Sequence, residues 1–421
     1  MPMAVDAAHA MAVGALRSEQ LVEECLARIR EREPAVQAWC HLDVEQALAQ
    51  ARARDRERAE GRRIGALHGL PVGVKDIIDT SDMPTENGSV LHAGRRPQQD
   101  AAVVTLLRAA GAIILGKTVS TEFATYAAGK TRNPHDATRT PGGSSSGSAA
   151  AVAAGMVPLA IGTQTNASIV RPASFCGVYG FKPSFGLIPR DGVLELSPSL
   201  DTVGLFAACL DDIALLARPL AVIEAAEAAV ERTPRYAFVK TPVWERCDAS
   251  TRAAFAGLIV GLEAHCEEVA LPDALAEAWG SHRTIMEAEM AVHLEREWER
   301  GRDKLSPSLR EQLLRGRDIR ALDYQKALVA RRRMGAVLAD LFTRFDALIT
   351  PASAGTAPAL ASTGDPAFGT LWSLCGLPAL SLPLLTGADG LPLGVQLVGA
   401  RGQDAQLLRS ARWLEARLAH R

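Results

Sequence analysis

Hydrophobic positions along the chain alternate between helical and strand-like spacing. Helical spacing predicts helices over 8–33, 43–63, 101–110 and 404–418. Short hydrophobic runs predict strands over 70–78, 112–115, 157–161, 176–182, 236–240, 347–350, 379–384 and 393–398. The rest of 210–345 is mostly helical in pattern, and Lys117 falls in the turn after its strand. Such alternation is typical of an α/β protein built around a sheet.

The 421 residues show no internal repeat and no clear domain boundary. The segment 351–368 is rich in Pro, Ala, Gly and Ser and resembles a linker. Strand-like runs lie on both sides of it, so we expect a loop within one domain. We therefore predict a single domain over 1–421.

Charge and composition exclude several classes of protein. The chain has 46 Lys+Arg and 48 Asp+Glu, a net charge of −2, whereas nucleic-acid binders usually carry a basic surface. Its 48% hydrophobic content excludes disorder as the main state. No apolar run reaches the ~20 residues that cross a bilayer. The first basic residue is Arg17, so the N-terminus does not look like a signal peptide.

The cysteines and histidines indicate neither a disulfide framework nor a metal site. The seven cysteines are odd in number and none are close in sequence, which predicts free thiols in a reducing cytoplasm. No His-x-x-x-His pair or Cys/His cluster is present in the sequence. We expect a cytoplasmic protein with no metal, nucleic-acid or membrane partner.

Lysine is rare in this chain, and Lys75 stands in an unusual place. Only seven of the 46 basic residues are lysines, and Lys75 lies in the apolar run GLPVGVKDIIDT. Burial disfavours the charged amine and lowers its pKa, so a buried lysine can act as a general base near neutral pH. The alternative is a salt bridge to Asp76 or Asp79, and the strand taken alone favours that ion pair.

A Gly/Ser-rich segment, TPGGSSSGSAAAVAAG, covers 140–155. It lacks the Gly-Lys-Ser/Thr ending of a phosphate-binding loop. A flexible linker is the other simple interpretation, but an Ala-rich helix over 148–155 follows at once. A long loop inside a compact domain is usually functional.

A third segment, 158–186, places Ser168 after a strand and a tight polar turn, at the start of a short helix. Backbone N–H groups at such a turn can stabilise an oxyanion. Alone, a serine at this position is more often a helix N-cap than a nucleophile.

Together the three segments resemble the amidase signature family over 65–204, and the likeness resumes over 347–400. Ser144 and Ser168 are 24 positions apart, which matches the family pattern. The resemblance implies that Lys75 is the base, Ser144 the serine after a cis peptide bond, and Ser168 the nucleophile. It implies that Ser145 and Thr163 support the triad. It also implies an oxyanion hole formed by the backbone N–H groups of Thr165, Asn166, Ala167 and Ser168.

The resemblance also implies a fold: an α/β/α sandwich with a central mixed, twisted sheet covered by helices. Within the domain, 65–204 would form the core with the triad, 210–345 a variable region that shapes the substrate pocket, and 346–421 the strands and helix that complete the sheet.

Several short motifs are most similar to malonamidase-like amidases, namely IIDT at 77–80, GTQT at 162–165, Arg-Pro at 171–172 and ASTGDP at 361–366. That similarity suggests a homodimer and implies that Arg171 binds a substrate carboxylate. Alternatively, Arg171 is an internal structural residue held in an ion pair.

The sequence departs from the family directly before the nucleophile, where Asn166–Ala167 replaces the usual Gly-Gly. Asn tolerates a positive φ better than most residues, and Ala does so poorly. We expect the new side chains to narrow or reshape the acyl pocket. Gln164 replaces the common aspartate of the same turn.

The resemblance thus predicts an amidase that hydrolyses the C–N bond of a small carboxamide through an acyl-enzyme on Ser168, with no cofactor. The alternatives are a carbamate hydrolase on the same triad, a component of a tRNA-dependent amidotransferase complex, and a non-catalytic binding protein. The last would not need Lys75, Ser144 and Ser168 together.

Overall fold

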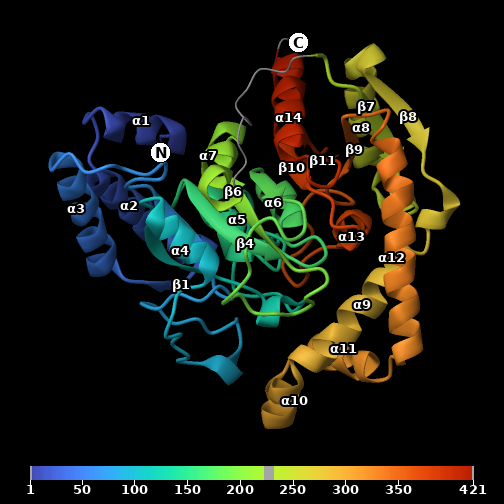
Figure 1. Ribbon diagram of the computed structural model, residues 1–421, viewed down its shortest axis with the longest axis horizontal. Coiled ribbons are helices and arrows are strands. Elements are labelled where there is room, and N and C mark those ends of the chain that lie inside the picture. The colour runs from blue at the N-terminus through green and yellow to red at the C-terminus, as the bar shows by residue number, and fades with distance from the viewer. Residues whose placement is uncertain (1, 222–231, 420–421) are drawn as a thin grey trace.

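Eleven strands form one mixed sheet in the computed structural model, which describes residues 2–221 and 232–419 (Figure 1). Their order across the sheet is β1-β3-β2-β4-β6-β5-β10-β11-β9-β7-β8. The strands are β1 (Trp39–Leu42), β2 (Pro71–Lys75), β3 (Ile113–Thr118), β4 (Leu159–Gln164), β5 (Tyr179–Lys182), β6 (Thr202–Ala207), β7 (Tyr236–Lys240), β8 (Cys266–Ala270), β9 (Ala347–Pro351), β10 (Ala379–Thr386) and β11 (Pro392–Val398).

The described helices surround this sheet. They are α1 (Ala4–Ala12), α2 (Ser18–Val36), α3 (Val44–Ala59), α4 (Ala102–Ala109), α5 (Ser146–Ala153), α6 (Val170–Cys176), α7 (Leu210–Ala221), α8 (Ala249–Leu262), α9 (Ala278–His293), α10 (Glu295–Gly301), α11 (Pro307–Arg317), α12 (Ala321–Leu341), α13 (Ala367–Leu374) and α14 (Asp404–Ala419).

The sheet combines parallel and antiparallel pairs. β2 is parallel to β3 and to β4, whereas β6 is antiparallel to β4 and to β5. The C-terminal strand β10 pairs antiparallel with β5, so the two halves of the chain join within the sheet. This arrangement confirms the predicted mixed sheet.

Alternate side chains of the central strands point to opposite faces, as the pleat of a strand requires. On β4, Ile161 joins a hydrophobic cluster with residues of α1, α4, α7 and α14. Its neighbour Ala160 joins a different cluster, with residues of α2, α5 and α6. Helices therefore cover both faces, which confirms the α/β/α layering.

A third cluster holds a helical region against the far strands of the sheet. Residues of α9, α11, α12 and α13 pack there with Ala237 and Val239 of β7. These helices stand along one side of the molecule (Figure 1). Of these, α9, α11 and α12 belong to the predicted region 210–345, of which 222–231 lies outside the described residues, whereas α13 follows that region in the sequence.

Several predicted elements differ from the structure. The helix expected over 8–33 is two helices, α1 and α2, separated by a turn in which Gly14 has a φ of 78°. Lys117 lies inside β3 rather than in a turn, and Ser168 precedes α6 by two residues. The strand expected from 176 begins at Tyr179, because α6 continues to Cys176. Sequence patterns also missed β1, β6, β8 and α13.

The structure bears on two further expectations. All seven cysteines are free thiols, as predicted. Among the described helices, none is both long and apolar enough to cross a membrane.

Candidate active site

Lys75 ends β2, between the neighbouring strands β3 and β4, and its side chain is fully buried. Its Nζ lies 2.7 Å from Ser144 Oγ and 2.8 Å from Thr163 Oγ1. Within the described part of the chain, no carboxylate lies within ion-pair distance of it. Asp76 is paired with Lys117 and Asp79 with Arg95, so the ion-pair interpretation of Lys75 was wrong.

Burial lowers the pKa of Lys75 to about 7, although the charge of Asp201 acts in the opposite direction. Desolvation disfavours the ammonium form, and hydroxyl partners compensate for this less than a carboxylate would. A substantial fraction of Lys75 is therefore a neutral amine at neutral pH. Such an amine can accept a proton from Ser144.

The loop before α5 presents Ser144 to Lys75. Gly142 has a φ of 83°, and a Cβ there would lie 2.8 Å from Pro172 Cα, so glycine is required. The next peptide bond, between Gly143 and Ser144, is cis, as the resemblance implies. Ser145 then fixes the loop to β4, because its Oγ donates to the carbonyl of Thr163 over 3.1 Å and accepts from its N–H over 3.3 Å.

Ser168 lies in the turn between β4 and α6, with 8% of its surface exposed. Gln164 Oε1 accepts from the N–H groups of Ile169 and Val170, over 2.8 and 3.1 Å, at the start of this helix. The Gln164 side chain thus accepts the first N–H groups of α6, so Ser168 is not required as the N-cap of that helix. In the part of the chain that the structure describes, the hydroxyls of Ser144 and Ser168 share no hydrogen bond. Of the three residues Lys75, Ser144 and Ser168, only Lys75 and Ser144 are therefore in direct contact.

The backbone around Ser168 offers unused donors. The N–H groups of Asn166, Ala167 and Ser168 have no protein acceptor among the described residues. Backbone N–H groups in a buried setting are nearly always bonded, so three consecutive free ones indicate a place for an acceptor. They are the arrangement expected of an oxyanion hole.

Asn166 and Ala167 fit this turn without backbone strain, since neither has a positive φ. The Asn166 side chain is anchored at both ends. Its Oδ1 accepts from Thr370 Oγ1 over 2.8 Å, and its Nδ2 donates to the Tyr126 hydroxyl over 3.3 Å. Its carbonyl accepts from Ser373 Oγ over 2.6 Å. The Asn166 side chain thus adds a link to Thr370 on α13, beside the carbonyl contact with Ser373 that a glycine could also make.

Gly369 on α13 makes room for this turn. A Cβ at Gly369 would lie 2.7 Å from Ala167 Cβ and 2.8 Å from the Asn166 carbonyl oxygen. The space that the Ala167 methyl group occupies is therefore available because position 369 of α13 has no side chain.

Arg171 is buried, with 1% of its surface exposed. Its guanidinium donates to the carbonyls of Gly143, over 2.6 Å, and Gly364, over 2.8 Å. Burial lowers its pKa to about 10. These contacts hold the Ser144 loop against the C-terminal region. They favour a structural role for Arg171, but through two carbonyls: among the described residues Arg171 forms no ion pair, which differs from the expected ion-pair role.

A cavity of about 590 Å³ opens beside the turn, between Tyr126, Asn166, α9 and the start of α13. Its charged residues are mostly paired. Arg246 contacts Asp365 over 2.9 Å, and Arg315 contacts Glu287 over 2.5 Å. Asn166, two positions before Ser168, lines the cavity, so the cavity adjoins the turn that carries Ser168.

Sequence reasoning missed two residues that hold the turn. His282 on α9 is fully buried, and burial lowers its pKa to about 4, so it is neutral. Its Nε2 lies 3.0 Å from the carbonyl of Thr165 and donates to it. The Thr165 hydroxyl in turn donates to Asp201. His282 lies in no local motif, and Asp201 precedes a strand that the pattern did not predict.

The described residues contain no group of three or more His, Cys, Asp or Glu that could hold a metal ion. Lysine, two serines and free backbone donors are instead suited to attack on an acyl carbon.

The profile of the Amidase family matches residues 20–408. The chain is 35% identical to a glutamyl-tRNA(Gln) amidotransferase subunit from Chloroflexus aggregans (strain MD-66 / DSM 9485), over 97% of this chain and 94% of that protein. A solved structure described as a crystal structure of amidase superposes with a TM-score of 0.91 at 33% identity, over 99% of this chain and 100% of its own.

A second structure comes from a vestigial protein complex that reveals the origins of an s-triazine catabolic enzyme. It has a TM-score of 0.92 at 29% identity, over 99% of this chain and 98% of its own. The match to the family and to amidase structures makes the protein a hydrolase that acts on carbon–nitrogen bonds. The chain belongs to the Amidase family.

Proposed function

We propose that the protein hydrolyses a small carboxamide through an acyl-enzyme on Ser168, with Lys75 and Ser144 as its proton relay. The observation that carries this proposal is the 2.7 Å contact between Ser144 Oγ and a buried lysine without a carboxylate partner among the described residues. The pKa of that lysine, lowered to about 7 by burial, suits a general base at neutral pH.

In the first half of the reaction, Ser168 Oγ attacks the amide carbon. Its proton passes to Ser144 Oγ, whose own proton passes to the neutral Lys75 amine. The carbonyl oxygen becomes an oxyanion, which the free N–H groups of Asn166, Ala167 and Ser168 stabilise. Thr165 N–H is the fourth expected donor. The relay requires Ser144 and Ser168 to approach when substrate binds, as catalytic hydrogen bonds often do.

In the second half, the C–N bond breaks and Ser144 returns a proton to the leaving nitrogen. Ammonia or an amine departs, and the acyl group stays on Ser168. Water then gives a proton to the relay and attacks the acyl carbon. The carboxylic acid leaves, and Ser168 regains its proton. Removal of one oxyanion donor typically costs about 3–4 kcal/mol of transition-state stabilisation.

The relative from Chloroflexus aggregans belongs to an amidotransferase, so the same site could release ammonia for a partner protein. Hydrolysis of a simple amide by the isolated chain would favour the independent amidase. Activity that appears only with glutamine and partner subunits would favour the amidotransferase. Cleavage of aryl carbamates but not of the matching aryl amides would favour the carbamate hydrolase.

The test is to trap the acyl-enzyme. The purified chain is mixed with activated amides and esters, quenched and analysed by peptide mass spectrometry. We expect an acyl adduct on Ser168 that is absent from Ser168→Ala, and greatly slowed acylation in Ser144→Ala. Ser146→Ala is the matched control, because the Ser146 hydroxyl is also buried but contacts the carbonyl of Val119. An adduct on another residue, or normal turnover by Ser168→Ala, would reject the proposal.

A further inference from the structure

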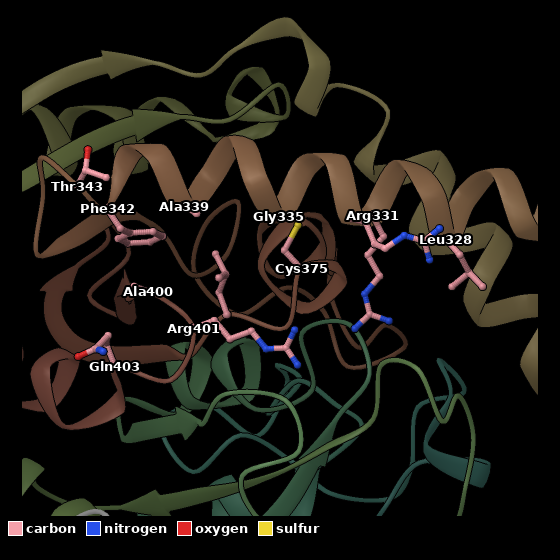
Figure 2. A pocket seen from close by; sticks show the side chains of 12 residues that line it. Leu328, Arg331, Gly335, Ala339, Phe342, Thr343, Cys375, Ala400, Arg401 and Gln403 are labelled. Carbon is pink, nitrogen blue, oxygen red and sulfur yellow. The ribbon is translucent and has the colours of Figure 1, made fainter.

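A second cavity, of about 700 Å³, lies beneath α12 (Figure 2). It shares no lining residue with the cavity beside Asn166. Three arginines line it, Arg331, Arg332 and Arg401, and no Asp or Glu does. Figure 2 shows Arg401 extending beneath α12 toward the side on which Arg331 lies.

Arg332 and Arg401 are exposed, and none of the three guanidinium groups has an ion-pair partner among the described residues. In the described ranges, none of them takes part in an ion pair or donates a hydrogen bond to a protein acceptor. Arg331 is half-buried and lies over the Phe185 ring, 5.4 Å from its centre. Burial lowers the pKa of Arg331 and the charge of Arg401 adds to this effect, whereas Cys375, Glu289 and Tyr324 act in the opposite direction. Arg331 and Arg401 thus lie close enough to repel each other, and no described carboxylate forms an ion pair with either.

General richness in arginine does not account for this arrangement. Another hollow on the same helix, lined by Arg333 and Lys326, also contains Glu277 and Asp323 and so carries both signs. At the start of α12, Arg320 is paired with Asp323 over 2.8 Å. Of these two hollows along α12, only the one that contains Arg331 is lined by charges of a single sign.

The rest of the lining is suited to an organic molecule. Leu328, Phe342 and Leu377 form an apolar wall, and Thr343 and Gln403 add neutral polar groups. Ligand sites in proteins typically combine such an apolar wall with a few convergent polar groups. The planar guanidinium forms paired hydrogen bonds to phosphate or carboxylate oxygens.

We propose that this cavity binds a small organic oxyanion, whose phosphate or carboxylate group lies between Arg331 and Arg401 and whose apolar part contacts Leu377. The anion supplies the counter-charge that the protein lacks there. Binding does not depend on the hydrolytic reaction, so the two proposals stand or fall separately.

The test is isothermal titration calorimetry on the full-length protein with four probes: inorganic phosphate, phenyl phosphate, benzoate and phenol. We expect saturable binding of phenyl phosphate or benzoate, weaker binding of inorganic phosphate and none of phenol. The tighter of the two aromatic anions identifies the preferred head group. Absence of saturable binding for every anion at millimolar concentration would overturn the proposal.

Variants locate the site. Arg331→Gln and Arg401→Gln should each weaken binding by about tenfold or more, since each removes a charged partner of the anion. Arg333→Gln is the matched control, because it removes the same charge from the same helix but from the other hollow. Equal weakening by Arg333→Gln would show a diffuse charge effect and reject the site. Circular dichroism and amide hydrolysis confirm that each variant is folded.

Discussion

Lys75 and Lys117 are buried lysines on the adjacent parallel strands β2 and β3, and their surroundings give them different tasks. In the register of the two strands, Val74 faces Lys117 and Lys75 faces Thr118. The Nζ of Lys117 lies 3.5 Å from Asp76 and donates to the carbonyls of Ile78 and Pro84, over 2.9 and 3.2 Å. The Nζ of Lys75 contacts two hydroxyls.

The difference lies in which form of the amine is stabilised. Burial lowers the pKa of both lysines, but for Lys117 the charge of Asp76 is the strongest opposing influence. Its ammonium is held in an ion pair and a ring of acceptors, which is a structural role. Lys75 has hydroxyls in place of a carboxylate, so its neutral form is accessible. Lys117 also donates to the Thr85 hydroxyl, so the carboxylate partner is what distinguishes the two lysines.

Replacement of Lys75 gives the largest expected effect and tests the comparison directly. Lys75→Met should lower kcat by on the order of 10³-fold or more, because members of such a triad act as a unit. It should not lower the melting temperature, since it removes a buried amine that is costly to charge. Steady-state kinetics and thermal melts measure the two. Lys182→Met is the control. Burial also lowers the pKa of Lys182 to about 7, but its Nζ donates to the carbonyl of Pro183, outside the site.

The matching change at Lys117 should have the opposite signature. Lys117→Met leaves the Asp76 carboxylate buried without its cation, which we expect to cost about 3–5 kcal/mol of unfolding free energy. The kcat per folded molecule should fall far less than in Lys75→Met. Urea denaturation monitored by fluorescence measures the loss. If Lys117→Met abolished catalysis in a fully folded protein, the division of roles between the two lysines would be wrong.

The pH dependence distinguishes the lysines at a smaller amplitude. Since Lys75 must be neutral, kcat/KM should rise about tenfold per pH unit below about pH 7 and level off above it. The folded pKa lies below the ordinary 10.5, so between about 7 and 10.5 the unfolded chain binds more protons than the folded one. The stability contributed by this group therefore rises with pH across that window. A flat profile between pH 5 and 8 would contradict the role of Lys75.

The smallest expected effect concerns the second hydroxyl. Thr163 Oγ1 accepts from Lys75 and so stabilises its charged form. Thr163→Val should move the acidic limb of the kcat/KM profile to lower pH by up to about one unit. Thr163→Ser keeps the hydroxyl and should leave the limb in place. A shift to higher pH in Thr163→Val would mean that the hydroxyl stabilises the neutral amine instead.

The sequence predicted what local pattern and spacing encode. Hydrophobic periodicity located most strands, and the 24-residue spacing of Ser144 and Ser168 helped to identify the family. The pattern placed Lys117 in a turn, because the hydrophobic run ends before Gly116, Lys117 and Thr118. These three residues are nevertheless part of β3, where they pair with β1 and β2.

The partners of the site residues lay beyond prediction, because they come from distant segments. Asp76 follows Lys75 directly, yet its carboxylate pairs with Lys117, and no local pattern shows this. The contact of His282 with Thr165 spans 117 positions and that of Ser373 with Asn166 spans 207. From the sequence we therefore expected Asn166 and Ala167 to reshape the acyl pocket, but we did not predict that α13 anchors them.

The anchoring of the nucleophile turn by α13 has a consequence for the order in which the enzyme matures during synthesis. A nascent chain that has emerged only as far as Ala207 already carries Lys75, Ser144 and Ser168. It lacks Thr370 and Ser373, which hold Asn166, and the Gly364 carbonyl, which binds Arg171. On the proposed mechanism, hydrolysis thus waits for the C-terminal part of the polypeptide, and a truncated product of translation carries the three side chains without the contacts that position them.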